Sequence, residues 1–450
     1  MRLTSSLSIT SAVLAAWLYV RPKSHGLASN LVGYVLKIVG AAFAPLISLS
    51  GLLGAMLARH TGQTGTGFLG FLGALMAAAF IRNVTAPHDG FEEAFGHDWE
   101  DRCRQALMQG TLPSHSSSPP QRRGAQLCTK SVLGRRWQLG QVATSPKPEV
   151  IRDLTYATVP SSSRRLLCDL WRPSGSAIGA SGASQSGVGV IYLHGGAWQA
   201  FDKDVATRPF FRHLCAQGHV VMDVAYRLAR ETDMRGMLGD VKRAITWLKR
   251  EGADWGVNPE RIVVAGASAG GHLALLAAYT PNNQDLDPPD MGSADTRVRG
   301  VIGYYPVVDL RSLTGFWSEH AMHPLGTAVG RILGYFPPEG YLPWSKLVER
   351  LFGMPLTAGA ALTRELLTFS PIAHVGAHCP PTLLLQGLHD HVVPVQDVQA
   401  LHRALVAAGR PAVHVELPQV EHAFDMVGLQ LSPPAQAALF DVERFLALVM

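Results

Sequence analysis

The sequence predicts an α/β protein with a mostly parallel sheet, preceded by transmembrane helices. Two observations predict this fold class. From residue 148 to the C-terminus, strand-like apolar runs alternate with helix-like runs, which is typical of a parallel sheet covered by helices on both faces. The first 82 residues are instead almost continuously apolar. The whole chain of 450 residues is 47% hydrophobic and 16% charged, and average soluble proteins carry about 25% charged residues.

Residues 1–82 are expected to form a membrane anchor of two or three transmembrane helices, and we favour three. The apolar segments are Ser5–Val20, Leu27–Ala58 and Gly67–Ile81. The middle segment contains Gly40–Ala58, a stretch without a charged residue that approaches the roughly 20 residues needed to span a bilayer. A cleaved signal peptide is the alternative for Ser5–Val20, but it would not explain the middle segment.

Two further patterns concern how these helices pack and point. Gly67, Gly70 and Gly73 have a spacing that suits close helix packing in lipid. With three spans, one side of the membrane receives Arg21, Lys23, Lys37 and Arg82, and the other receives Arg2 and Arg59. The positive-inside rule then places the large C-terminal domain on the cytoplasmic side, and one span fewer would reverse this orientation.

Residues 83–147 are expected to be a juxtamembrane segment and linker. Phe91–Leu107 has the pattern of an amphipathic helix, and Leu112–Gly124 is rich in Ser and Pro, as flexible linkers are. His97, Asp98 and Glu100 are residue types that can ligate a metal, but an exposed polar face is the favoured interpretation. The net charge is +5, yet no nucleic-acid-binding motif accompanies it, so the expected large partner is the lipid bilayer. The oligomeric state is left open.

Residues 148–450 are expected to form one catalytic domain. The expected strands are Arg165–Trp171, Val188–Leu193, Val220–Tyr226, Arg261–Ala265, Val298–Tyr304, Thr382–Gln386 and Ala412–Leu417. The expected helices are Arg235–Arg250, Ala269–Tyr279, Gln396–Ala408 and Ala435–Val449. Residues 311–370 interrupt this alternation with many Pro, Trp and Phe residues, which predicts a cap or lid inserted beside the sheet.

Ser268 is the candidate nucleophile. It lies in Gly-Ala-Ser-Ala-Gly, directly between an expected strand and an expected helix. A nucleophile elbow needs this setting, because small residues must flank a serine held in a strained turn. The helix that follows directs N–H groups and the positive end of its dipole at the site, which favours an oxyanion.

A second motif, Tyr-Leu-His-Gly-Gly-Ala-Trp at residues 192–198, follows an earlier strand. Gly195 and Gly196 allow backbone N–H groups to approach a substrate oxygen, and Ala269 supplies the N–H that follows the nucleophile. These three residues are the candidate oxyanion hole. We interpret His194 as a residue that braces the loop, and Trp198 as a substrate-binding residue.

An acid and a base complete the site. Asp390 and His422 each follow an apolar strand, where a carboxylate can orient an imidazole. Asp397 is the rival acid, but it falls in the following helix. His414 alternates within a strand. The chain order of serine, aspartate and histidine matches that of a triad on an α/β sheet.

These motifs resemble the hormone-sensitive-lipase branch of the α/β-hydrolases, which includes carboxylesterases and kynurenine-formamidase-like enzymes. The resemblance covers about residues 150–450 and rests on HGGAW, YRLA, GASAGG, the Asp390 loop and EHAFD. Where many members have a third glycine after His-Gly-Gly, this chain has Ala197. The N-terminal segments resemble those of membrane-anchored esterases.

The resemblance implies an α/β-hydrolase fold and a serine hydrolase that cleaves a small hydrophobic carboxylic ester through an acyl-enzyme. It implies no cofactor and no metal. Amide hydrolysis of the arylformamidase type is the alternative within the class, because the oxyanion chemistry is shared. A non-catalytic hydrolase-fold binding module is the alternative from another class. Such modules usually lose a triad member, and every element is present here.

Overall fold

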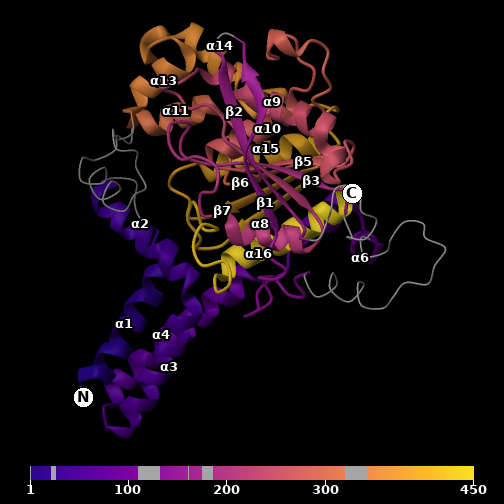
Figure 1. Cartoon of the computed structure of the whole chain (residues 1–450). Coiled ribbons are helices and arrows are strands. Elements are labelled where there is room, and N and C mark those ends of the chain that lie inside the picture. The colour runs from indigo at the N-terminus through magenta and orange to yellow at the C-terminus, as the bar shows by residue number, and fades with distance from the viewer. Residues whose placement is uncertain (1, 22–26, 110–131, 161, 175–185, 320–341) are drawn as a thin grey trace, which may run out of the picture.

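The computed structural model describes residues 2–21, 27–109, 132–160, 162–174, 186–319 and 342–450. Figure 1 shows two parts: an α/β domain that contains the sheet, and a bundle of N-terminal helices that projects from it, with the N-terminus at the far end. Part of the expected linker and part of the expected cap insertion lie outside the described residues.

The described residues include an eight-stranded sheet with the order β1-β2-β4-β3-β5-β6-β7-β8. Strands β3 to β8 run parallel, and β2 is antiparallel to both of its neighbours, β1 and β4. The strands are β1 (Glu149–Val159), β2 (Arg164–Arg172), β3 (Gly189–Leu193), β4 (Val220–Val224), β5 (Ile262–Ala267), β6 (Gly300–Tyr304), β7 (Thr382–Gly387) and β8 (Ala412–Leu417). The seven expected strands are therefore confirmed, and β1 was missed.

Helices cover both faces of this sheet. Successive side chains of a strand point to opposite faces, so each strand contributes to two apolar cores. On β3, Ile191 and Leu193 belong to one apolar core, and Val190 and Tyr192 belong to the other. The first core includes side chains of α9 (Met234–Glu251), α10 (Ala269–Tyr279) and α15 (Val395–Ala407). The second includes side chains of α8 (Arg208–Ala216) and α16 (Pro433–Val449). Strands buried on both faces explain the continuous apolar runs of the sequence.

The cap insertion contributes helices α11 (Leu310–Glu319), α13 (Trp344–Phe352) and α14 (Ala360–Thr368). Leu347, Val348 and Leu351 of α13 are buried in the same core as α9 and α10. The described part of residues 311–370 is therefore packed onto the α/β domain.

The N-terminal region forms α1 (Arg2–Tyr19), α2 (Leu27–Ala42), α3 (Ala44–His60) and α4 (Thr64–Val84). Among the described residues, one helix, α4, is long and apolar enough to cross a membrane, judged by length and composition. The segment Gly33–Ala42 and helix α3 meet these criteria only as a pair, and they are bent by 80°. The apolar stretch Leu27–Ala58 is thus not one straight helix. Pro45 lies at the start of α3, where proline cannot continue a preceding helix.

The bundle of α1, α3 and α4 has small side chains inside and large apolar side chains outside. A Cβ on Gly51 would lie 2.5 Å from the Gly70 carbonyl oxygen, and one on Gly73 would lie 2.6 Å from the Ala12 nitrogen. Fifteen of the seventeen large apolar side chains that are exposed in the described residues lie between residues 9 and 75. They include Val13, Leu49, Met56, Phe68 and Leu75.

Two short helices, α5 (Gly90–Phe95) and α6 (Trp99–Gln109), replace the single amphipathic helix expected over Phe91–Leu107. That expectation was wrong because the chain turns at Gly96, which has a φ of 88°, in a region that favours glycine. His97 pairs with Glu92 on the exposed surface. Phe91 and the α4 residues Phe80 and Val84 join the core beside α16, which attaches the bundle to the α/β domain.

Candidate active site

Ser268 lies between β5 and α10 and has a φ of 55°, a value that costs energy for a residue other than glycine. The small neighbours make this turn possible. A Cβ on Gly266 would lie 2.4 Å from the carbonyl oxygen of Gly270, and a Cβ on Gly270 would lie 2.1 Å from that of Leu193. Close contact between the end of β3 and the start of α10 therefore requires Gly270. The strain presents the serine side chain at the carboxyl edge of the sheet.

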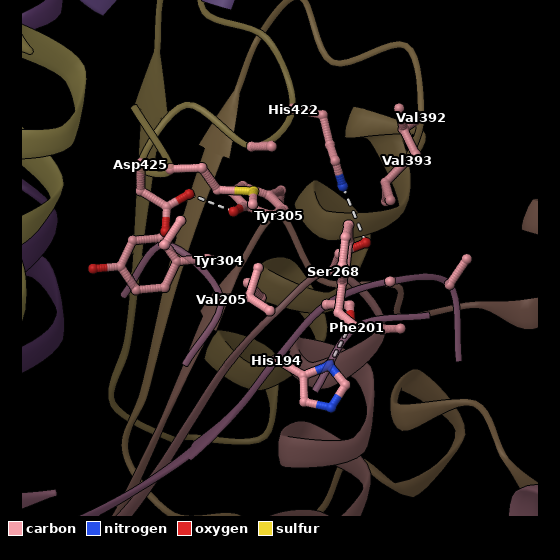
Figure 2. Close-up of a pocket in the computed structure, with 18 of the residues that line it drawn as sticks. His194, Phe201, Val205, Ser268, Tyr304, Tyr305, Val392, Val393, His422 and Asp425 are labelled. Atoms are coloured by element: carbon pink, nitrogen blue, oxygen red, sulfur yellow. Dashed lines mark hydrogen bonds between the residues drawn. The ribbon is translucent and has the colours of Figure 1, made fainter. Parts of the chain in front are cut away.

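Ser268, His422 and Asp390 form a continuous hydrogen-bonded chain. The Nε2 atom of His422 lies 3.0 Å from the Ser268 Oγ, and its Nδ1 atom lies 2.8 Å from the Asp390 Oδ2. Figure 2 marks the hydrogen bond between His422 and Ser268. A carboxylate can only accept, so Nδ1 carries the proton and Nε2 is free to accept from the serine hydroxyl. The structure brings together all three residues that the sequence singled out for nucleophile, base and acid.

The carboxylate of Asp390 is held by four donors. Its Oδ1 accepts from the backbone N–H groups of Val392 and Val393, at 2.8 and 2.9 Å. Its Oδ2 accepts from the Gln386 Nε2 at 2.8 Å, in addition to the imidazole. These hydrogen bonds fix the orientation of the carboxylate, so Asp390 presents a fixed acceptor to His422.

Two rivals named in the sequence have other partners. Asp397, in α15, accepts a hydrogen bond of 2.9 Å from the Ser312 hydroxyl, and burial raises its pKa to about 6. His414, in β8, lies beside His402, and burial lowers its pKa to about 3. Neither residue belongs to the chain that ends at Ser268.

The His-Gly-Gly loop lies against the nucleophile. A Cβ on Gly195 would lie 3.4 Å from the Ser268 Cβ, and Gly196 has a φ of 113°. Ala269 is the first residue of α10, and N–H groups in the first turn of a helix have no acceptor within the helix. Gly195, Gly196 and Ala269, the residues expected to form the oxyanion hole, thus line the same pocket as Ser268.

His194 braces this loop, as expected from the sequence. Its Nδ1 atom lies 2.7 Å from the Gly195 carbonyl oxygen, and its ring stacks on Tyr226 with centroids 4.5 Å apart. Burial lowers the pKa of His194 to about 4, so the imidazole is neutral at physiological pH. Its dashed line in Figure 2 ends on a backbone oxygen, whereas the dashed line from Ser268 ends on His422.

Trp198 lines the pocket beside Ser268, but it is also a core residue with only 2% of its surface exposed. Its indole N–H donates to the His272 Nδ1 at 3.2 Å, and the Nε2 of that histidine lies 2.7 Å from the Phe369 carbonyl oxygen. The only polar side-chain atom of Trp198 is thus already paired, and the tryptophan contributes apolar surface to the pocket lining.

Ser268 opens into a pocket with a volume of about 720 Å³ and a mostly apolar lining. Tyr305 lies in its wall, and the centroids of the Tyr305 and His422 rings are 4.3 Å apart. The Tyr305 hydroxyl donates to Asp425, which also lines the pocket (Figure 2). Burial raises the pKa of Asp425 above its ordinary value, although the Tyr305 hydroxyl acts against this shift.

Sequence motifs did not reveal the contribution of helix α2 to this pocket. Tyr34, Val35, Ile38 and Val39 line it, although they lie more than 150 residues before the first motif of the site. Tyr305 and Asp425 were also missed. The sequence signal that was available for Asp425 is its place three residues after His422 in the same loop.

The order of the sheet, the serine turn and the three hydrogen-bonded side chains define this protein as an α/β-hydrolase. Residues 180–405 match the BD-FAE family. The chain belongs to this family.

The chain is similar to ester hydrolases of Mycobacterium tuberculosis. It is 32% identical to the probable carboxylic ester hydrolase LipM over 76% of this chain and 73% of LipM. It is 28% identical to the esterase LipQ over 91% of this chain and 83% of LipQ. The apo structure of Thermogutta terrifontis esterase 2 is 23% identical, with a TM-score of 0.49, over 67% of this chain and 93% of that chain. The protein is an esterase.

Proposed function

We propose that this protein is a membrane-anchored serine esterase that cleaves a carboxylic ester of a hydrophobic substrate through an acyl-enzyme intermediate. The observation that carries the proposal is the hydrogen-bonded chain from Ser268 through His422 to Asp390. It ends in a mostly apolar pocket, which suits an ester with hydrocarbon substituents.

In the first half-reaction, the His422 Nε2 takes the hydroxyl proton of Ser268 while the Oγ attacks the ester carbonyl carbon. Asp390 holds the imidazole in this tautomer and stabilises the imidazolium. The imidazolium then gives its proton to the leaving alkoxide, and the acyl group stays on Ser268. Water enters in place of the alcohol, and the same transfers in reverse release the carboxylic acid.

The negative charge on the carbonyl oxygen is the main cost of each step. The backbone N–H groups of Gly195, Gly196 and Ala269 are the proposed donors to this oxygen, and Trp198 is proposed to contact the acyl side of the substrate. One oxyanion donor typically contributes roughly 10²–10³ in rate. The positive end of the α10 dipole adds to this stabilisation.

The composition of the bundle of α1, α3 and α4 supports membrane anchoring. Its interior is mostly glycine, alanine and serine, for example Gly70 and Ser11, whose hydroxyl donates to the Ile47 carbonyl at 2.9 Å. Its exterior carries leucine and phenylalanine. A bundle in water would bury its large apolar side chains, whereas helices in lipid pack through small ones.

The distribution of charge supports a defined orientation. Arg59 lies in the last turn of α3, at the end of the bundle near the N-terminus, and Arg82 lies in the last turn of α4, near the catalytic domain. With Arg21 and Lys37 also on the catalytic side, we propose that this domain faces the cytoplasm. A C-terminal fusion to alkaline phosphatase tests this orientation, because the phosphatase is active only outside the cytoplasm. An active fusion would contradict it.

A fluorophosphonate probe tests the nucleophile, because it reacts covalently with an activated serine. Wild-type protein in membranes should be labelled, and Ser268→Ala should not. The matched control is Ser312→Ala, which removes a hydroxyl that is bonded to Asp397 away from the triad and should leave labelling intact. An unlabelled wild type that is also inert on p-nitrophenyl esters of every chain length would overturn the proposal.

Alkaline carbonate extraction tests the anchor. The full chain should stay in the membrane pellet, as an integral protein does, while a peripheral protein is released. Replacing the exposed Leu49, Phe68 and Leu75 with serine should weaken this retention, because these side chains would lose their contact with lipid. Release of the wild-type chain by carbonate would contradict membrane insertion.

A further inference from the structure

Helix α2 joins the N-terminal bundle to the active site. It meets α3 at a bend of 80° and contacts α16 of the α/β domain (Figure 1). Its side chains Tyr34, Val35, Ile38 and Val39 line the pocket into which Ser268 opens. The wall of the pocket is therefore built partly by the segment that adjoins the proposed membrane anchor.

Polar contacts hold α2 against the loops of the triad. The Tyr34 hydroxyl donates to the His422 carbonyl at 3.2 Å, and its ring meets the His391 ring edge-on at 4.8 Å. Lys37 is fully buried, and its ammonium group donates to the Val20 carbonyl and to the Nδ1 of His389, the residue before Asp390. These contacts fix α2 beside the loops that carry the acid and the base.

The other side of α2 is apolar and exposed. Leu36 has 46% of its surface exposed, and Val39, which also lines the pocket, has 38% exposed. Lys37 is the one charged residue of the helix sequence, and it points into the protein. The next helix, α3, also exposes apolar side chains, among them Leu46 and Leu49. Exposed apolar side chains therefore lie both on the proposed anchor and on the helix that lines the pocket.

We propose that α2 forms a lateral opening of the active site toward the bilayer, through which the hydrocarbon chain of a lipid ester reaches Ser268. This inference rests on the proposed membrane-anchored esterase. The pocket volume of about 720 Å³ accommodates a long chain, and chains of that kind partition into lipid rather than water. The substrate class is an ester with a long hydrocarbon chain, drawn from the membrane.

The first experiment tests whether α2 contacts the chain. Full-length protein in phosphatidylcholine vesicles is assayed on 4-methylumbelliferyl palmitate and acetate. Val39→Trp should fill the opening. The ratio of kcat/KM for palmitate to kcat/KM for acetate should then fall by at least about tenfold, because several methylene groups of the palmitate chain would lose their place in the pocket. The matched control is Val406→Trp, on α15, which is 56% exposed and outside the pocket. It should leave the ratio unchanged. Equal ratios in the two variants would overturn the proposal.

The second experiment tests the route from the bilayer. Leu36→Asp places a charge on the exposed face of α2, and the control Val406→Asp places one on α15. We expect Leu36→Asp to lower the rate on palmitate ester in vesicles relative to the rate on the same ester in detergent micelles, and Val406→Asp to leave this ratio unchanged. An unchanged ratio for Leu36→Asp would show that the chain arrives from outside the bilayer, which overturns the lateral opening.

The two proposals fail in different ways. A wild-type protein that hydrolyses neither ester and does not react with the fluorophosphonate would contradict the proposed function. A wild type that hydrolyses both esters, together with a Val39→Trp variant of unchanged ratio, would contradict only the role of α2.

Discussion

The hydroxyl of Tyr226 donates a hydrogen bond of 2.8 Å to the backbone carbonyl of His194, and its ring stacks on the imidazole of the same residue. The tyrosine thus holds both the main chain and the side chain of the residue before Gly195. Backbone N–H groups can stabilise an oxyanion only if they are held at hydrogen-bonding distance from it. Tyr226 is therefore expected to be a positioning residue for the oxyanion loop.

Tyr226→Phe keeps the stacked ring and removes the hydrogen bond. We expect kcat to fall by roughly tenfold, less than the loss of a whole oxyanion donor, with little change in KM. The free energy of unfolding should fall by about 1 kcal/mol. Steady-state kinetics on p-nitrophenyl butyrate measures the first effect. Tyr156→Phe is the control, because the Tyr156 hydroxyl also donates to a backbone carbonyl, that of Ala225, but does not touch the loop. Equal losses of kcat in both variants would contradict the positioning role.

Gly195 and Gly270 have different roles, and alanine substitutions should distinguish them. Gly195→Ala should affect catalysis, and Gly270→Ala should affect folding. A Cβ on Gly195 would lie 3.2 Å from the Ala267 carbonyl oxygen and beside the Ser268 Cβ, so small shifts should let Gly195→Ala fold. These shifts displace an oxyanion donor, and kcat should fall by roughly 10².

A Cβ on Gly270 would lie 2.1 Å from the Leu193 carbonyl oxygen. Gly270→Ala should therefore push α10 away from β3 and greatly lower the yield of folded protein. Gly315→Ala is the control, since Gly315 is exposed on α11 with no atom within 4 Å of the added Cβ. Thermal denaturation in detergent checks the order of stability. A Gly270→Ala protein as stable as the wild type would contradict the close contact.

Asp390→Asn should prevent His422 from acting as the base and should leave the protein folded. The backbone N–H groups of Val392 and Val393 require an acceptor, so the asparagine oxygen must face them and its NH₂ must face His422. The imidazole Nδ1 then has to accept, which puts the remaining proton on Nε2, toward Ser268. A protonated Nε2 cannot accept the serine proton. We expect kcat to fall by about 10⁴, as for the wrong tautomer in other triads.

Stopped-flow kinetics of acylation measures this loss. The control is Asp397→Asn, which changes the rival carboxylate in α15, bonded to Ser312. It should keep wild-type acylation within about twofold, because changes outside the hydrogen-bonded chain of a triad leave its base intact. If both variants lost the same activity, the assignment of Asp390 as the acid of the triad would be wrong.

The sequence predicted Ser268, Asp390 and His422 because each lies in a short motif at the end of an apolar strand, and parallel strands end at one edge of a sheet. It did not predict that α2 forms part of the pocket wall. Tyr34 and His422 are 388 residues apart in the sequence, and no local sequence pattern indicates a contact between them. The charge-free run Gly40–Ala58 suggested one continuous span. Its hydropathy does not show the bend at Phe43, whereas Pro45 is a local signal for it.

The pair of Asp425 and Tyr305 predicts a dependence of stability on pH. Burial raises the pKa of Asp425 above its ordinary value of 3.8, so the folded protein binds a proton there more readily than the unfolded chain does. The folded state is therefore favoured at low pH, and this contribution is lost as the pH rises from the ordinary value through the raised one.

Asp425→Asn keeps an acceptor for the Tyr305 hydroxyl and cannot ionise. Its stability relative to the wild type should increase as the pH rises above about 4, and it should level off once Asp425 is ionised in the folded protein. Thermal denaturation in detergent between about pH 3 and about pH 8 measures this difference.

Asp153→Asn is the control of opposite sign, because the hydrogen bond from Lys203 lowers the pKa of Asp153 from its ordinary value of 3.8. Its relative stability should decrease over the pH range just below 3.8 and stay low above it. A relative stability of Asp425→Asn that does not change with pH would mean that Asp425 ionises in the folded protein as easily as in water.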